Sequence, residues 1–243
     1  MITLIINGLK VTVPEGTTIL EAARRLDVEI PTLCHHEGLS PQGSCRLCMV
    51  EIEQRGRRRL VASCMFPVAE GLVVETETET VAGARRFVLG LLRDRCPRSE
   101  EIAALAARYG AKPFGRLPLG ERDLCIHCDR CVRACEEEAT GCIAFSFRGW
   151  ARRVEGPFGE APADCIGCGA CAQVCPTGFI AVEEEGGMRK IWGKSFELLR
   201  CSACGKPFAT REELVFQGLD EGDLLCDRCR KREFAASFTR GVR

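Results

Sequence analysis

Residues 125–135 read CIHCDRCVRAC, and residues 165–176 read CIGCGACAQVCP. Each stretch places four cysteines in the order C-x2-C-x2-C-x3-C, and Pro176 follows the second stretch. Thiolates at this spacing can converge from a single loop, and they are soft enough to suit iron–sulfur clusters. The doubled order is typical of chains that hold two 4Fe–4S clusters, and it disfavours zinc ligation and disulfide bonds. The sequence therefore predicts that this chain carries electrons.

The ligand sets are expected to cross between the two blocks. In this pattern the first three cysteines of a block hold one cluster, and the fourth cysteine binds the cluster of the other block. One 4Fe–4S cluster is therefore expected on Cys125, Cys128, Cys131 and Cys175. The second is expected on Cys165, Cys168, Cys171 and Cys135.

Composition limits the classes of protein to consider. The chain has 243 residues and 18 cysteines, with 34 basic and 34 acidic side chains. This balance gives no electrostatic reason to expect nucleic-acid binding, and the length with metal sites favours two or three small domains. Most cysteines have C-x2-C spacings, which favours a reducing compartment over a disulfide scaffold. Neither a basic leader nor a run of about 18 apolar residues is visible. We therefore expect a cytoplasmic protein without a membrane span.

Residues 1–80 are expected to form a β-grasp domain. Alternating apolar residues flank Asn7-Gly8, a dipeptide that suits a turn with positive φ, and predict a hairpin over residues 1–13. Thr18 and Glu21 have the spacing of a capping box at the start of a helix. Further strands are expected at residues 49–53, 60–62 and 72–76.

Two helices are expected to follow the β-grasp domain. The first covers residues 81–95, and its apolar stripe is expected to be Ala84, Phe87, Val88, Leu91 and Leu92. Ser99 is expected to start the second, whose apolar face is Ile102, Leu105, Ala106 and Tyr109. The fold class is therefore α+β, with a helical connector at 81–120, a two-cluster ferredoxin-type domain at 121–182 and a small module at 192–243.

A further set of cysteines, Cys34-x10-Cys45-x2-Cys48-x15-Cys64, lies in the amino-terminal region. Plant-type 2Fe–2S proteins have a first gap of four residues, so this spacing departs from their pattern. A zinc site is the alternative. His35 and His36 follow Cys34, but a Rieske site would need a different arrangement, so they are expected at the surface or behind the ligands.

The sequences around these cysteines are CHHEGL from Cys34, GSCRLCMVEIE from Gly43, ASCMFPV from Ala62 and EGLVVET from Glu70. They resemble the 2Fe–2S domain of the large iron–sulfur subunit of respiratory complex I, and of its relatives in NAD-linked and iron-only hydrogenases. Residues 125–137, with Arg148-Gly149 and Gly159-Glu160, also look like the diaphorase and hydrogenase small subunits of this family. The resemblance covers about residues 1–182 and implies a 2Fe–2S cluster on Cys34, Cys45, Cys48 and Cys64.

The chain departs from this family in two respects. Many members hold another 4Fe–4S cluster with one histidine and three cysteines, whereas the corresponding stretch here offers only Cys96. That cluster is expected to be absent, with the two helices in its place. Nothing after residue 182 resembles the catalytic domain of iron-only hydrogenases, and neither G-x-G-x-x-G after a strand nor G-x4-G-K-[ST] is present. The sequence therefore predicts redox centres without a reaction centre of its own.

The last cysteine pairs are Cys201-x2-Cys204 and Cys226-x2-Cys229, which predict a zinc ribbon. A rubredoxin-type iron has the same spacing and is the alternative. A docking role is expected for this module, because a short segment with little core can be held by one metal. Cys96 and Cys142 are expected to be buried small hydrophobic residues, and His127 is expected to face solvent.

The leading hypothesis is a non-catalytic electron-transfer subunit of a soluble multisubunit oxidoreductase. A flavin- or NAD-binding subunit would exchange electrons with this chain, which would relay them to or from a catalytic subunit such as a hydrogenase or formate dehydrogenase. An electron-bifurcating assembly is one form that such a complex could take. The alternative hypothesis is a free-standing iron–sulfur and zinc module with a structural or sensory role.

Overall fold

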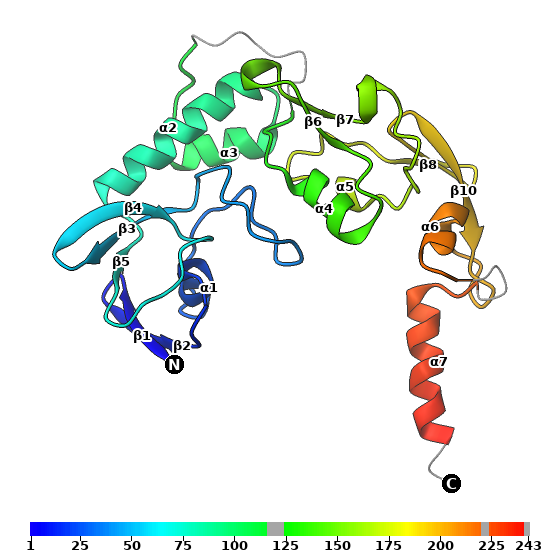
Figure 1. Cartoon of the computed structure of the whole chain (residues 1–243), viewed down its shortest axis with the longest axis horizontal. Helices are drawn as coiled ribbons and strands as arrows, with labels where there is room; N and C mark the ends of the chain where they lie inside the picture. The colour runs from blue at the N-terminus through cyan, green and yellow to red at the C-terminus, as the bar shows by residue number, and fades with distance from the viewer. Residues whose placement is uncertain (116–123, 220–223, 241–243) are drawn as a thin grey trace.

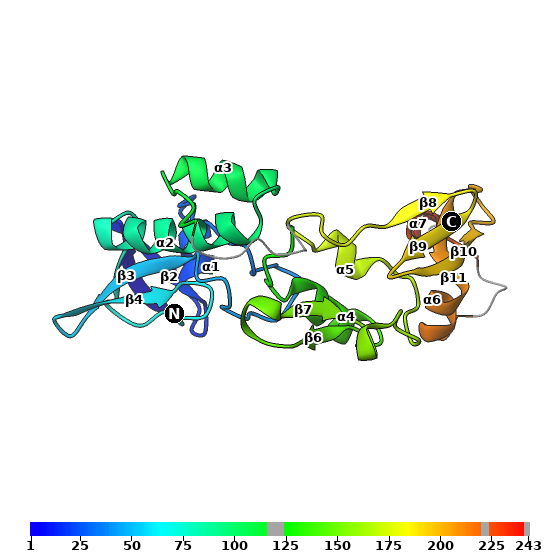
Figure 2. The same ribbon diagram turned by 90° about the horizontal axis from the view of Figure 1, so that it is seen from above.

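The computed structural model describes residues 1–115, 124–219 and 224–240. The amino-terminal sheet lies at one end of an elongated molecule, the two cysteine blocks lie in the middle, and a second sheet lies beyond them (Figure 1). The view from above shows the same order (Figure 2). None of the described helices is both long and apolar enough to cross a membrane.

The amino-terminal sheet has the order β2-β1-β5-β3-β4. Strands β1 and β2 form the predicted antiparallel hairpin, and Asn7 and Gly8 have φ values of 48° and 79° at its turn. The predicted capping box is also present, because Thr18 and Glu21 bond reciprocally at the start of helix α1. The bounds are β1 Ile2–Ile6, β2 Leu9–Val13, α1 Ile19–Arg24, β3 Met49–Gln54, β4 Arg57–Ala62 and β5 Val73–Glu75.

Helices α2 (Glu79–Arg95) and α3 (Glu100–Arg108) follow the sheet, and the two predicted helices are confirmed. Ser99 caps α3 by accepting a hydrogen bond from the Ile102 amide at 3.3 Å. The predicted apolar stripe of α2 was wrong, because its buried side carries Val81 and Leu89, whereas Phe87 is 57% exposed. The reason is a buried arginine on the true inner face.

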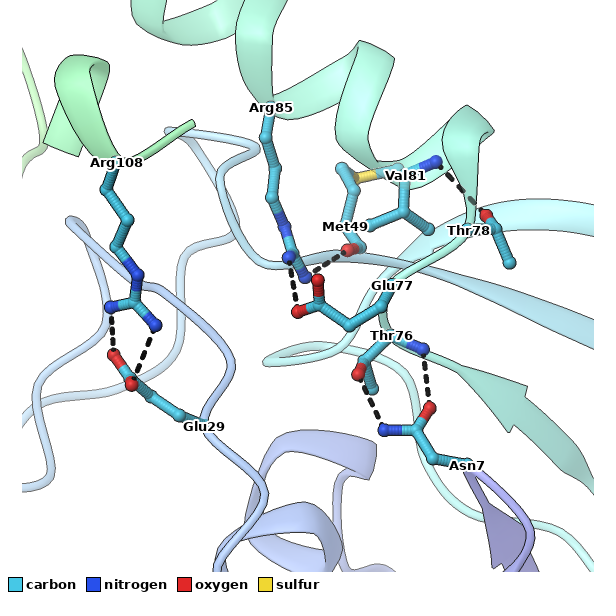
Figure 3. A network of polar contacts seen from close by, with 9 residues as sticks. All are labelled: Asn7, Glu29, Met49, Thr76, Glu77, Thr78, Val81, Arg85 and Arg108. Atoms are coloured by element: carbon cyan, nitrogen blue, oxygen red, sulfur yellow. Dashed lines mark hydrogen bonds and ion pairs between the residues drawn. The ribbon is translucent and has the colours of Figure 1, made fainter. Parts of the chain in front are cut away.

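Arg85 is 1% exposed and fills the inner face of α2 between Val81 and Leu89. Its guanidinium donates to the Met49 carbonyl at 3.3 Å and to Glu77 at 3.4 Å (Figure 3). A hydrophobic pattern treats arginine as polar, so it indicated the opposite face. Buried arginine is tolerated here because these partners satisfy its charge.

Two further contacts fix the connector and the hairpin. Arg108 at the end of α3 donates to Glu29 at 2.6 and 2.9 Å, and Asn7 bonds with Thr76 at 2.8 and 2.9 Å (Figure 3). The first contact ties α3 to the loop after α1, and the second ties the hairpin turn to the residue after β5. The surface that carries Cys34 is therefore held by the sheet and by the connector.

The two cysteine blocks form a compact unit in which helices α4 and α5 pack together. Cys131 and Cys135 lie on α4, Cys171 lies on α5, and a short hairpin of β6 and β7 lies between the two blocks in the sequence. The bounds are α4 Arg130–Glu138, β6 Ala144–Ser146, β7 Arg153–Glu155 and α5 Ala170–Gln173, with single 3₁₀ turns at Gly149–Ala151 and Pro157–Gly159.

The carboxy-terminal sheet has the order β11-β10-β9-β8. It begins at Glu183, upstream of the expected module boundary at residue 192, and its Ile191 and Phe196 share a core with Cys171 and Ile180. Helix α7 extends away from this sheet (Figure 1). The bounds are β8 Glu183–Glu185, β9 Met188–Ile191, β10 Lys194–Arg200, β11 Pro207–Thr210, α6 Arg211–Phe216 and α7 Asp227–Arg240.

Candidate iron–sulfur and metal sites

The structure brings the four amino-terminal cysteines together beside the β-grasp sheet. The Cys48 and Cys64 sulfurs are 3.3 Å apart, and the Cys45 amide donates to the Cys34 sulfur at 3.5 Å. Contact with Cys45 lowers the pKa of Cys34, and contact with Cys34 raises the pKa of Cys45 and of Cys64. Thiols this close cannot all ionise unless a cation compensates their charge, so the set suits a metal cluster.

The cysteines of the two blocks line two separate cavities. One cavity is lined by Cys125, Cys128, Cys131 and Cys175. The other is lined by Cys135, Cys142, Cys165, Cys168 and Cys171. Each cavity thus combines three cysteines of one block with the fourth cysteine of the other block, which is the crossed grouping expected from the sequence.

Burial makes these thiols poor anions without a metal. Burial raises the pKa of Cys128 to about 11 and the pKa of Cys171 to about 11. A bound iron centre removes the proton outright, because a coordinating thiol is deprotonated. Apolar walls that include Val154 and Ile180 complete the first cavity. The donor set and its surroundings therefore fit 4Fe–4S clusters.

Both block loops turn in the same way. His127 and Asp129 have φ values of 53° and 70°, and the equivalent Gly167 and Gly169 have φ values of 71° and 79°. The left-handed conformation is easy for glycine and costs energy for other residues. The first block therefore holds His127 and Asp129 in a strained conformation, which the cysteine spacing alone did not reveal.

His127 does not face solvent, so that expectation was wrong. It is half-buried, Arg95 of α2 donates to its Nε2 atom at 2.6 Å, and its ring packs on Phe145. Burial, with the charges of Arg95 and Arg152, lowers the pKa of His127 to about 4. The imidazole is therefore neutral at physiological pH, between two predicted ligands.

The 2Fe–2S loop and the first block are in direct contact. Arg133 of α4 is 5% exposed, and it donates to the Cys34 carbonyl at 2.6 Å and to the Ser40 carbonyl. Ser44 Oγ donates to the Cys128 carbonyl at 3.4 Å. Sequence reasoning missed Arg133. Its position on the same helix as two predicted ligands, with Cys135 only two residues further on, was the available signal.

The carboxy-terminal sheet contacts the second block at its predicted ligands. Trp192 donates from Nε1 to the Cys171 sulfur at 3.4 Å. Lys194 donates to the Cys165 carbonyl at 3.0 Å, and Arg189 donates to the Gly167 carbonyl at 2.8 Å. These residues lie outside the cysteine motifs, so the sequence pattern did not select them. The carboxy-terminal module is therefore packed against the second cavity.

The last four cysteines form a compact set. The sulfurs of Cys201, Cys204, Cys226 and Cys229 all lie within 4.8 Å of one another. The Cys226 amide lowers the pKa of Cys201 to about 6. Such a set fits a tetrahedral metal such as zinc or a single iron. The first pair lies between β10 and β11, whereas the second pair lies at the start of α7, so the expected ribbon form stays a prediction.

The two remaining cysteines have different environments. Cys96 is fully buried in the core between α2, α3 and the first block, as expected. Cys142 is half-buried and lines the second cavity, with its sulfur 3.7 Å from the Cys135 sulfur. The expectation of a plain buried hydrophobic residue was therefore wrong for Cys142.

Comparisons with known proteins agree with this geometry. Residues 1–79 match the 2Fe-2S iron-sulfur cluster binding domain family, residues 121–182 match a 4Fe-4S dicluster domain family, and residues 164–210 match another 4Fe-4S dicluster domain family. The NADP-reducing hydrogenase subunit HndD of Solidesulfovibrio fructosivorans is 38% identical over 76% of this chain and 36% of its own length.

Two further relatives extend the comparison. An NADH-quinone oxidoreductase subunit of Rhizobium meliloti is 33% identical over 84% of this chain and 27% of its own length. A chain in the crystal structure of the NAD+-reducing nickel–iron hydrogenase in the H2-reduced state is 30% identical, with a TM-score of 0.60, over 73% of this chain and 85% of that chain. This chain therefore spans about a quarter to a third of the length of the two curated relatives and most of the structural one.

Proposed function

Because this chain belongs to the family of iron–sulfur subunits that combine a 2Fe–2S domain with a 4Fe–4S dicluster domain in NAD(P)-linked hydrogenases and NADH-quinone oxidoreductases, we propose that it is an electron-transfer subunit. It exchanges single electrons with a flavin- or NAD-binding subunit and with a catalytic oxidoreductase subunit in the cytoplasm. The grouping of its cysteines into separate sets, with the first two sets in contact, carries this proposal.

The proposed ligands follow from those sets. Cys34, Cys45, Cys48 and Cys64 hold a 2Fe–2S cluster. Cys125, Cys128, Cys131 and Cys175 hold one 4Fe–4S cluster, and Cys165, Cys168, Cys171 and Cys135 hold the other. Cys201, Cys204, Cys226 and Cys229 hold one zinc ion, with a single iron as the alternative. When bound, the clusters supply reversible one-electron centres, whose potentials in proteins span roughly −700 to +450 mV.

The protein residues contribute position and electrostatics. Arg133 and Ser44 support a fixed approach of the 2Fe–2S loop to the first block, because each bridges the two parts by a hydrogen bond. Arg95 and the neutral His127 lie beside the first block, and Trp192 lies beside the second. Donors and cations near cluster sulfurs stabilise the reduced, more negative state and so tune potentials.

The decisive experiment is an anaerobic affinity purification of the tagged chain from its host, with mass identification of the co-purified subunits. A flavin- or NAD-binding subunit together with a metal-dependent catalytic subunit is expected. A chain recovered alone, with clusters that cannot be reduced without loss of the fold, would instead favour a structural or sensory module.

Metal analysis tests the cofactor assignment. About ten irons (two, four and four) and one zinc per chain are expected. Eleven irons without zinc would replace the zinc site by a rubredoxin-type iron. The crossed ligation is tested by Cys175→Ser, which is expected to damage the cluster of the first block; damage confined to the second block's cluster would refute it.

A further inference from the structure

The second cavity holds more thiols than a cubane needs. A 4Fe–4S cluster takes four thiolates, one for each iron. Among the described residues, five cysteines line this cavity, and Cys142 is the one that the ferredoxin-type pattern does not include. Cys142 also lies within hydrogen-bonding reach of Cys165, so its thiol lies beside two of the proposed ligands.

The separation of the Cys135 and Cys142 sulfurs is informative. They are 3.7 Å apart. Two thiolates bound to one tetrahedral metal at about 2.3 Å lie about 3.8 Å from each other. The same chain offers an internal comparison, because the Cys204 and Cys226 sulfurs of the proposed zinc site are 3.8 Å apart. Cys142 is thus placed to reach the same iron corner as Cys135, and not a different one.

The backbone builds this placement. Helix α4 ends after Glu138, and the Gly141 amide donates back to the Cys135 carbonyl at 2.8 Å. Gly141 has a φ of 66°, a conformation that glycine adopts without strain, so the chain can reverse directly beside Cys135. Thr140 Oγ1 donates to the Asp164 carbonyl at 2.9 Å, which ties the turn to the second block next to Cys165.

We propose that Cys142 is a reserve ligand of the second 4Fe–4S cluster, which binds the iron corner of Cys135 when the bond to Cys135 is broken. This inference rests on the proposed function, because it needs that cluster. The exchange replaces one iron–thiolate bond by another. The proton of the Cys142 thiol passes to the departing Cys135 thiolate, so the charge and the oxidation state of the cluster do not change.

The test compares single and double variants of the full chain, purified without oxygen. Alanine is used because a serine hydroxyl could itself bind iron. Cys135→Ala is expected to keep about ten irons per chain, and the combination of Cys135→Ala with Cys142→Ala is expected to lose between about one and four of them. Cys168→Ala is the matched control, since it removes a proposed ligand that has no sulfur–sulfur hydrogen bond in the described structure. It is expected to lose iron as the double variant does.

Electron paramagnetic resonance supplies a second readout. Loss of one corner leaves a 3Fe–4S cluster, which is visible in the oxidised state. That signal is expected in the double variant and in Cys168→Ala, and not in Cys135→Ala. The signal of the reduced 2Fe–2S cluster reports in every sample whether the chain has folded. A Cys135→Ala protein as depleted as the double variant, with its 2Fe–2S signal intact, would overturn the inference.

If Cys135→Ala does not fold, Cys142→Ala still tests the proposal. In the native chain a reserve thiol recaptures iron whenever the Cys135 bond opens, so Cys142→Ala is expected to lose iron to a ferrous chelator faster than the native chain. Equal rates would overturn the proposal. A native chain that lacks two 4Fe–4S clusters would instead refute the proposed function, so the two failures are distinguishable.

Discussion

Arg133 is predicted to hold the 2Fe–2S loop against the first block, and Arg133→Met tests this role. Methionine keeps much of the side-chain length, but it removes the donors to the Cys34 and Ser40 carbonyls. A hydrogen bond from a charged group contributes about 1.5–3 kcal/mol, and part of this is offset because the buried charge is also removed. The expected loss is therefore about 2–3 kcal/mol in the free energy of opening this contact.

Amide hydrogen exchange followed by mass spectrometry measures that opening. Since about 1.4 kcal/mol corresponds to a factor of ten, amides at residues 34–45 are expected to exchange about 30- to 150-fold faster in Arg133→Met. Strands β1 and β3 are expected to keep their native rates. The exposed Arg25, changed to methionine, serves as control. Unchanged exchange at residues 34–45, or equal acceleration throughout the amino-terminal sheet, would refute the role assigned to Arg133.

Three further predictions concern single residues. Trp192→Phe keeps an aromatic ring but removes the donor to the Cys171 sulfur, so a redox titration should find the potential of the second cubane lower by about 20–60 mV; an unchanged potential would contradict this. Arg85→Met should lower the free energy of unfolding by about 2 kcal/mol in urea, whereas no loss would mean that its buried bonds contribute nothing. Hydrogen bonding to Thr18 lowers the pKa of Glu21, so the stabilisation is present above the ordinary carboxyl pKa and is lost as the pH falls through the lowered value; Glu21→Gln should remove this part of the pH dependence in acid titration, and an unaltered profile would exclude it.

The contacts between domains give the chain a consistent electronic layout. Arg133 and Ser44 join the 2Fe–2S loop to the first block, α4 packs against α5, and Trp192 and Lys194 cover the second block. Successive cysteine sets are therefore held by hydrogen bonds and not by linkers alone. A fixed geometry of this kind is what outer-sphere transfer between neighbouring centres requires.

Local chemistry was sufficient for much of this protein. The hairpin turn at Asn7-Gly8, the capping box at Thr18 and the cap at Ser99 depend on residues within a few positions of one another, so their spacing predicted them. Cluster motifs are local for the same reason, because three of the four ligands come from one loop. The sequence alone thus determined the β-grasp hairpin, the helical connector and the identity of the candidate cysteines.

Long-range packing decided the rest. The inner face of α2 depends on a buried Arg85 whose partner Met49 lies 36 residues away, and a hydrophobic pattern cannot register a charge that tertiary contacts neutralise. The same applies to Arg133, to His127 and to Trp192, whose partners come from other domains. Cys142 became interpretable only when the turn at Gly141 placed its sulfur beside Cys135. Spacing along the chain fixes which thiols can share a loop, whereas only the folded backbone fixes which side chains meet them.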